Sequence, residues 1–200
     1  KVKSYPHKFK SVKPKNVILM IGDGMGVAQI FAGMTANKGH LFIDNFKHIG
    51  FSRTQSADNY ITDSAAGATA LSTGIRTYNG AVGVDKDTIA LKTVLELAEI
   101  RGLSTGLVST SSITHATPAS FIAHQKSRTM YEDIAADFLK TDIDVFIGGG
   151  YKHFTQRKDS RNLVEELKSK GYLVSRNIKH ISKVKSGKLA GLTALEHNGR

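Results

Sequence analysis

The sequence predicts an α/β fold in which a mainly parallel sheet carries helices on both faces. Two observations lead to this prediction. Short apolar runs alternate with longer segments whose apolar residues recur at helical spacing, a pattern typical of parallel strands joined by right-handed crossovers. The run at residues 16–21 (NVILMI) is also continuously apolar, as expected of a strand buried on both faces of such a sheet.

Three elements are expected to follow that strand. A helix is expected at residues 27–36, directly after a glycine-rich turn at residues 22–26. An extended segment at residues 49–55 reads as the next strand. The polar residues 62–64 (TDS) can cap a helix N-terminus, and the small residues that follow predict a closely packed helix at residues 65–74.

The helix expected at residues 89–101 has a clearer amphipathic pattern, and Gly102 marks its end. Its apolar face is expected to comprise Leu91, Val94, Leu95 and Ala98. Further strands are expected at residues 104–109, 144–147 and 172–174, and further helices at residues 129–140 and 162–170. Because functional groups in such sheets gather at the carboxyl ends of the strands, the loops that follow the strands are the places to search.

Composition and charge limit the possible functions. The chain has 200 residues, 40% of them hydrophobic, and no cysteine, which excludes disulfides, thiolate nucleophiles and cysteine-ligated metals. The net charge of +11 is concentrated at the two ends of the chain. We interpret residues 1–15, with six lysines and no acidic residue, as a basic N-terminal arm, and residues 16–200 as an α/β domain. Neither a nucleic-acid partner nor a membrane span is expected, because no matching motif or apolar run is present.

Asp23 lies between two glycines after the first expected strand, where its carboxylate could accept a cation. An aspartate that only caps the next helix explains this motif equally well. Ser64 is expected at a helix N-terminus, where the helix dipole stabilises an alkoxide or a phosphoryl oxygen, although a plain N-cap serine is the simpler interpretation.

His115 and Thr117 lie two residues apart in a loop after a strand, so both side chains could ligate one cation. Arg128, just before an expected helix, could bind an anion with its guanidinium group. Taken singly, an ordinary surface histidine and an ordinary surface arginine remain the alternatives. His124 reads as a core or helix histidine with satisfied hydrogen bonds.

Taken together and in order, three blocks closely resemble the alkaline phosphatase family. They are Ile21-Gly22-Asp23-Gly24-Met25-Gly26, the run Thr62-Asp63-Ser64-Ala65-Ala66-Gly67-Ala68-Thr69-Ala70, and the stretch from His115-Ala116-Thr117-Pro118-Ala119 to Ser127-Arg128. The resemblance extends over nearly the whole chain. It implies a metal-dependent phosphomonoester hydrolase that acts through a phosphoserine intermediate on phosphate monoesters.

By this resemblance Ser64 is the nucleophile, Arg128 grips the phosphate, and Asp63 orients Arg128. A complete site of the family holds two Zn²⁺ ions and one Mg²⁺ ion. The metal ligands that the resemblance implies in this chain are Asp23, Ser64, His115 and Thr117. The resemblance also implies a homodimer for the complete enzyme and a periplasmic or secreted location.

Several blocks of the family have no counterpart in this chain. A glutamate for the magnesium site, an Asp-x-x-x-His pair with a later histidine for one zinc, and an Asp-His pair for the other are missing. The chain therefore resembles the N-terminal part of the family's α/β domain, and its sheet is expected to be incomplete. The alternative function is a non-catalytic module that binds phosphate or metal without turnover. A phosphodiesterase or sulfatase relative is a weaker alternative.

Overall fold

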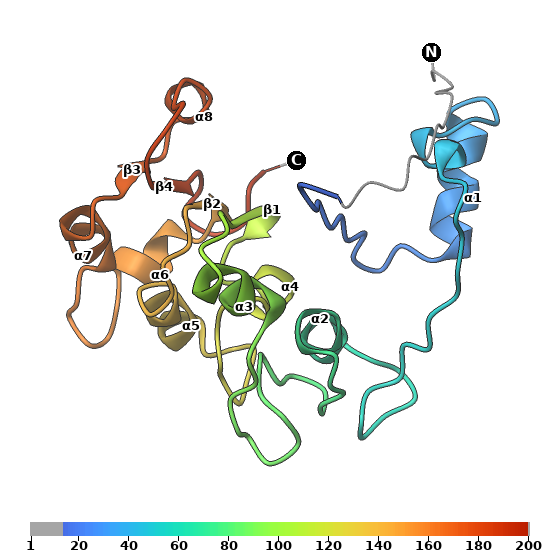
Figure 1. Cartoon of the computed structure of the whole chain (residues 1–200), viewed down its shortest axis with the longest axis horizontal. Coiled ribbons are helices and arrows are strands. Elements are labelled where there is room, and N and C mark those ends of the chain that lie inside the picture. Colours follow the sequence, from blue (N-terminus) through green and yellow to red (C-terminus); the bar gives the residue numbers. More distant parts are fainter. Residues whose placement is uncertain (1–13, 200) are drawn as a thin grey trace. The chain divides into compact units, whose positions relative to one another are not determined.

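A computed structural model of the chain describes residues 14–199. It forms two compact units, which divide between Arg53 and Thr54 and are described separately here (Figure 1). The predicted basic arm lies almost entirely outside the described residues, so both domain boundaries stay predictions. No helix in the described part of the chain is long and apolar enough to cross a membrane.

The first unit contains α1 (Val27–Ala36) and a short 3₁₀ helix, η1 (Phe42–Asn45). The predicted helix at residues 27–36 is thus confirmed to the residue. The strands predicted at residues 16–21 and 49–55 are wrong, because neither segment is paired with another strand. An apolar run becomes a strand only where a partner supplies ladder hydrogen bonds. The side chains of Val17, Ile18 and Met20 accordingly stay exposed.

The second unit contains the remaining elements. Its strands are β1 (Gly106–Ser112), β2 (Val145–Gly149), β3 (Leu173–Ser175) and β4 (Leu189–Leu192). Its helices are α2 (Ser64–Thr73), α3 (Val94–Ile100), α4 (Ala116–Ala119), α5 (Tyr131–Asp137), α6 (Tyr151–Thr155), α7 (Leu163–Ser169) and α8 (Ile178–Ile181).

These strands form one parallel sheet in the order β1-β2-β4-β3. The sequence predicts β1, β2 and β3 but not β4, which is inserted between β2 and β3 and is wholly buried. The run LAGL is too short, and too poor in β-branched residues, to be recognised as a strand. The fold class is nevertheless confirmed: parallel strands alternate with helices.

One face of the sheet packs against aromatic side chains. Phe146 of β2 is fully buried, and its ring centroid lies 4.9 Å from that of Phe138 and 5.8 Å from that of Tyr172. Phe154 of α6 completes this cluster at 6.1 Å from Phe146. Helices α5, α6 and α7 contribute to the same core, so they cover this face.

Helix α8 packs on part of the opposite face, over β3 and β4, whereas Val108 of β1 on this face is 75% exposed. Ile147 follows Phe146 in the strand and therefore points to the other side of the sheet, where it is paired with Gly191 of β4. A Cβ atom at Gly191 would lie 2.9 Å from Ile181 of α8 and 3.1 Å from Ile147. Glycine is thus required for α8 to pack this closely, and the sheet has helices on both faces as predicted.

Helix α3 is shorter than its amphipathic pattern suggests. Thr93 caps it, and the Glu96 side chain accepts a hydrogen bond from the Thr93 N–H at 2.9 Å, so the helix begins at Val94. Of the apolar face predicted for this helix, only Leu95 is buried, and Val94 is 53% exposed. Gly102, with φ +68°, ends the helix as predicted.

Two buried threonines of this unit differ in their hydrogen bonding and give a stability test. The Thr69 hydroxyl accepts a hydrogen bond from the Gly83 N–H at 3.0 Å, whereas the Thr77 hydroxyl has no partner among the described residues. We expect Thr77→Val to leave the free energy of unfolding unchanged or to raise it by up to about 1 kcal/mol. Thr69→Val should lower it by about 1 to 3 kcal/mol, because a buried N–H loses its acceptor. Urea unfolding would measure both, and equal losses would contradict the expectation.

Candidate active site

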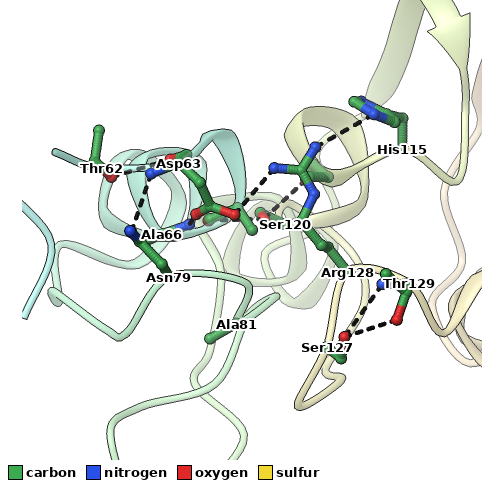
Figure 2. A network of polar contacts seen from close by, with 12 residues as sticks. Thr62, Asp63, Ala66, Asn79, Ala81, His115, Ser120, Ser127, Arg128 and Thr129 are labelled. Atoms are coloured by element: carbon green, nitrogen blue, oxygen red, sulfur yellow. Dashed lines mark hydrogen bonds and ion pairs between the residues drawn. The ribbon is translucent and has the colours of Figure 1, made fainter. Parts of the chain in front are cut away.

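Ser64 is the first residue of α2, and Asp63 caps the helix in front of it. The Asp63 Oδ1 atom accepts a hydrogen bond from the Ala66 N–H at 2.9 Å (Figure 2). This bond fixes the first turn of α2 and holds the half-buried Ser64 at the positive end of the helix dipole. The position suits an anion or an oxygen that develops negative charge.

Asn79 holds the segment that leads into this helix. Its Oδ1 atom accepts a hydrogen bond from the Asp63 N–H at 3.0 Å, and its Nδ2 atom donates to the Ile61 carbonyl at 2.9 Å. Asp58 in turn accepts from the Asn79 N–H at 3.0 Å. The sequence analysis missed Asn79, since an Asn-Gly pair indicates a turn but does not reveal a contact 16 residues away.

The backbone around Arg128 is held by hydrogen bonds to residues 80 and 82. The Arg128 N–H donates to the Gly80 carbonyl at 2.7 Å, and Gln125 exchanges two hydrogen bonds with Val82 at 2.9 and 3.0 Å. Residues 80–82, which make these hydrogen bonds, directly follow Asn79. The backbones that carry Arg128 and Asp63 are therefore connected through a few short contacts.

The guanidinium of Arg128 lies between two other predicted site residues. Nη1 donates to Asp63 Oδ2 at 3.0 Å, and Nη2 lies 3.3 Å from His115 Nε2 (Figure 2). Since an arginine can only donate, this contact makes Nε2 of His115 the acceptor. Both side chains of the ion pair are 25% exposed, so the guanidinium remains accessible to a solute.

Asp63 stays ionised over a wide pH range. Its partial burial by itself would raise its pKa, but the hydrogen bond from the Ala66 N–H and the Arg128 guanidinium outweigh burial. The pKa of Asp63 is therefore lowered below its usual range. The carboxylate thus accepts from the helix and from Arg128 at the same time.

His115 is brought close to this pair at the start of α4, and Thr117 follows two residues later. Both are half-buried, and the His115 N–H donates to the Ser112 carbonyl at 3.0 Å at the end of β1. The ring of His197 lies edge-on to that of His115 with centroids 5.3 Å apart, and its Nδ1 atom accepts from the Ser112 N–H at 3.1 Å. No local pattern singles out His197, because 82 positions separate it from His115.

Asp23 lies in the first unit, in the turn before α1, where Gly24 adopts φ +69°. Asp23 is exposed. The predicted turn is present, but the strand predicted before it is not. The role of Asp23 as a metal ligand remains a prediction.

The residues present supply only part of a metal site. No group of three or more histidine, aspartate or glutamate side chains in the described residues is arranged to hold a metal ion. The imidazole of His115 and the hydroxyls of Ser64 and Thr117 are suitable donor types, but a closed zinc site needs about four ligands. We therefore derive no chemical step through a metal.

The arrangement can bind an oxyanion beside a hydroxyl. A guanidinium, a helix N-terminus and a serine hydroxyl come together, and a carboxylate fixes the guanidinium in place. Such a set fits a phosphate group, because arginine and N-terminal N–H groups both donate to phosphate oxygens.

Comparison with known proteins gives a consistent result. A family model described as alkaline phosphatase matches residues 14–197. Alkaline phosphatase 4 of Bacillus subtilis (strain 168) is 44% identical over 195 residues, covering 90% of this chain and 42% of that protein. The alkaline phosphatase of Escherichia coli (strain K12) is 37% identical over 197 residues, covering 81% of this chain and 42% of that protein. The chain thus spans less than half the length of these relatives.

Solved structures agree with the sequence relatives. The alkaline phosphatase from the Antarctic bacterium TAB5 superimposes with a TM-score of 0.87 at 43% identity, covering 93% of this chain and 55% of that one. The structure of a mutant of the TAB5 enzyme, with the same TM-score and 42% identity, is described as having Mg bound in the M3 site.

The lowered pKa of Asp63 predicts an acid-dependent contribution to stability. Asparagine is an equally good N-cap, so Asp63→Asn isolates the charge pairing with Arg128. At pH 7 we expect this change to lower the free energy of unfolding by about 1 kcal/mol, a figure reduced for the solvent that reaches the pair.

The difference between wild type and Asp63→Asn should be constant above a pH of about 4 and should disappear as the pH falls through the lower pKa of the folded state. Urea unfolding from pH 7 to pH 2 measures it. In an Arg128→Gln background the same substitution should cost less, and an equal cost would show that the pair does not stabilise the fold.

Proposed function

The chain belongs to the alkaline phosphatase family, and we propose that it hydrolyses phosphate monoesters through a phosphoserine intermediate on Ser64. The observation that supports this best is the contact between Arg128 and Asp63, which places a guanidinium beside the N-terminus that carries Ser64. It is the arrangement that a phosphomonoester dianion requires, with donors on its non-reacting oxygens and a hydroxyl in reach of phosphorus.

In the proposed reaction the Ser64 oxygen attacks phosphorus as the bond to the leaving oxygen breaks. The Ser64 proton passes to solvent, and the leaving oxygen takes up a proton from solvent, so the leaving group departs as an alcohol. Water then attacks the phosphoserine, which releases inorganic phosphate and restores the serine. Arg128 donates to the phosphate oxygens throughout, and the N-terminus of α2 contributes about 1 kcal/mol of further stabilisation.

Metal ions, when bound, would make the serine alkoxide and a hydroxide accessible near neutral pH and would stabilise the leaving oxygen. We propose two Zn²⁺ ions and one Mg²⁺ ion per complete site. Asp23, Ser64, His115 and Thr117 would supply part of the ligands, and residues outside those described here would supply the rest. The Mg bound in a TAB5 mutant supports the choice of magnesium.

A second candidate is favoured by the incomplete donor set. With no group of three metal-ligating side chains across the described residues, the chain by itself would bind phosphate or metal without turnover. Phosphate binding through Arg128 and the helix N-terminus needs no catalytic metal. The two candidates differ in a single observable, the release of phosphate.

Location and assembly follow from the family only. We propose a periplasmic or secreted location and a homodimer of the complete enzyme. Phosphate monoesters are the proposed partners, and nucleic acid is not proposed as one.

Hydrolysis of an aryl phosphate monoester at alkaline pH, with zinc and magnesium added, tests the proposal. We expect phosphate release that Ser64→Ala reduces by at least about a thousandfold, since the nucleophile is lost. Ser169→Ala, on the exposed surface of α7, is the matched control and should retain full activity.

Release that persists in Ser64→Ala would refute the phosphoserine route. If a folded wild-type chain binds inorganic phosphate but releases none from the monoester, the binding module is the function of this chain. Absence of both binding and turnover would overturn both candidates.

A further inference from the structure

Residues 121–128, called here the arginine strap, connect α4 to Arg128. The strap begins in the core, where Phe121, Ile122 and Ala123 are buried. It ends at the guanidinium that contacts Asp63 and His115. The position of that guanidinium therefore depends on what holds the strap.

His124 connects the strap to three other segments of the chain. Its Nδ1 atom lies 2.7 Å from the Gly83 carbonyl oxygen, and its Nε2 atom lies 3.1 Å from Glu96 Oε1. Its backbone N–H donates to Asp137 Oδ2 at 2.9 Å. One residue thus links the strap to the loop at residues 80–83, to α3 and to α5.

Both ring nitrogens of His124 face acceptors. A carbonyl oxygen and a carboxylate oxygen cannot donate, and a neutral imidazole carries a single N–H. The ring and the Glu96 carboxylate are 20% and 12% exposed, so this contact is shielded from water on most sides.

Charged side chains of α3 and α5 lie around the His124 ring and backbone. Glu96 of α3 faces it directly, with Lys92 3.7 Å from the same carboxylate oxygen. From α5, Asp137 faces the His124 backbone and is paired with Lys140 at 2.6 Å. Burial by itself would raise the pKa of Glu96, but the Thr93 N–H and His124 outweigh it, and the pKa is lowered.

The loop that accepts the ring is shaped for this approach. Gly83 has φ +61°, and a Cβ atom there would lie 2.1 Å from the Ala123 carbonyl oxygen and 2.9 Å from His124 Nδ1. A side chain at position 83 would therefore push the strap away. The adjoining hydrogen bonds of Val82 with Gln125, and of Gly80 with Arg128, continue the same line of contacts.

We propose that His124 is a positioning residue for Arg128. It ties the strap to the 80–83 loop and to α3, and so sets where the guanidinium meets Asp63. It does not itself touch a ligand. The significance for phosphate rests on the proposed function, but the effect on Arg128 does not.

The test compares the variant His124→Gln with a control variant, His180→Gln. His180 lies in α8 and contacts Ser175. Glutamine can donate to only one of the two acceptors. Glu96→Gln is the second variant, since its amide oxygen can still accept from the Thr93 N–H while the negative charge is lost.

Two measurements are made on the 200-residue chain near pH 7: nitrogen NMR of the Arg128 guanidinium, and titration with inorganic phosphate. His124→Gln should shift the Arg128 signals and weaken phosphate binding about tenfold. Glu96→Gln should act in the same direction, and His180→Gln should change neither measurement.

Arg128 signals that are unchanged in folded His124→Gln and Glu96→Gln would overturn the positioning role. If the wild-type chain binds no phosphate, the proposed function fails, and the Arg128 signals still decide this inference.

Discussion

The ion pair of Asp63 and Arg128 is the contact on which the candidate site depends. The two residues are 65 positions apart, and the carboxylate divides its oxygens between two tasks. Oδ1 caps α2 through the Ala66 N–H, and Oδ2 holds the guanidinium at 3.0 Å. The direction of the helix that carries Ser64 and the position of the Arg128 guanidinium are therefore set by one side chain.

Small residues allow the surrounding elements to approach closely enough for this pair to form. Helices α2 and α4 pack through alanines that are almost fully buried, among them Ala65 and Ala116. The Ser72 hydroxyl donates to the Ser120 carbonyl at 2.6 Å, and the Ser120 hydroxyl lies 3.3 Å from the Ala65 carbonyl oxygen. These hydroxyls bond to backbone carbonyls where α2 and α4 meet. The packing of the two helices therefore also aligns the N-termini that carry Ser64 and His115.

The sequence predicted well those features that local chemistry determines. A helix cap within residues 62–64, which Asp63 rather than Ser64 provides, the helix end at Gly102 and the parallel α/β class follow from residue type and periodicity. What it missed depends on partners far along the chain. Strand β4 is recognisable only once β2 and β3 flank it, and the run at residues 16–21 has apolar residues but no strand partner.

The site follows the same division. The motif blocks suggested Asp63, Ser64, His115 and Arg128, and the structure brings Asp63, His115 and Arg128 into one network with Ser64 next in sequence. Asn79, His124 and His197 contact partners far along the chain, which no local pattern in the sequence reveals. The Asp63 carboxylate reduces the electrostatic attraction of the proposed site for an anion. The same carboxylate already immobilises the flexible Arg128 side chain, so a phosphate need not order that side chain on binding.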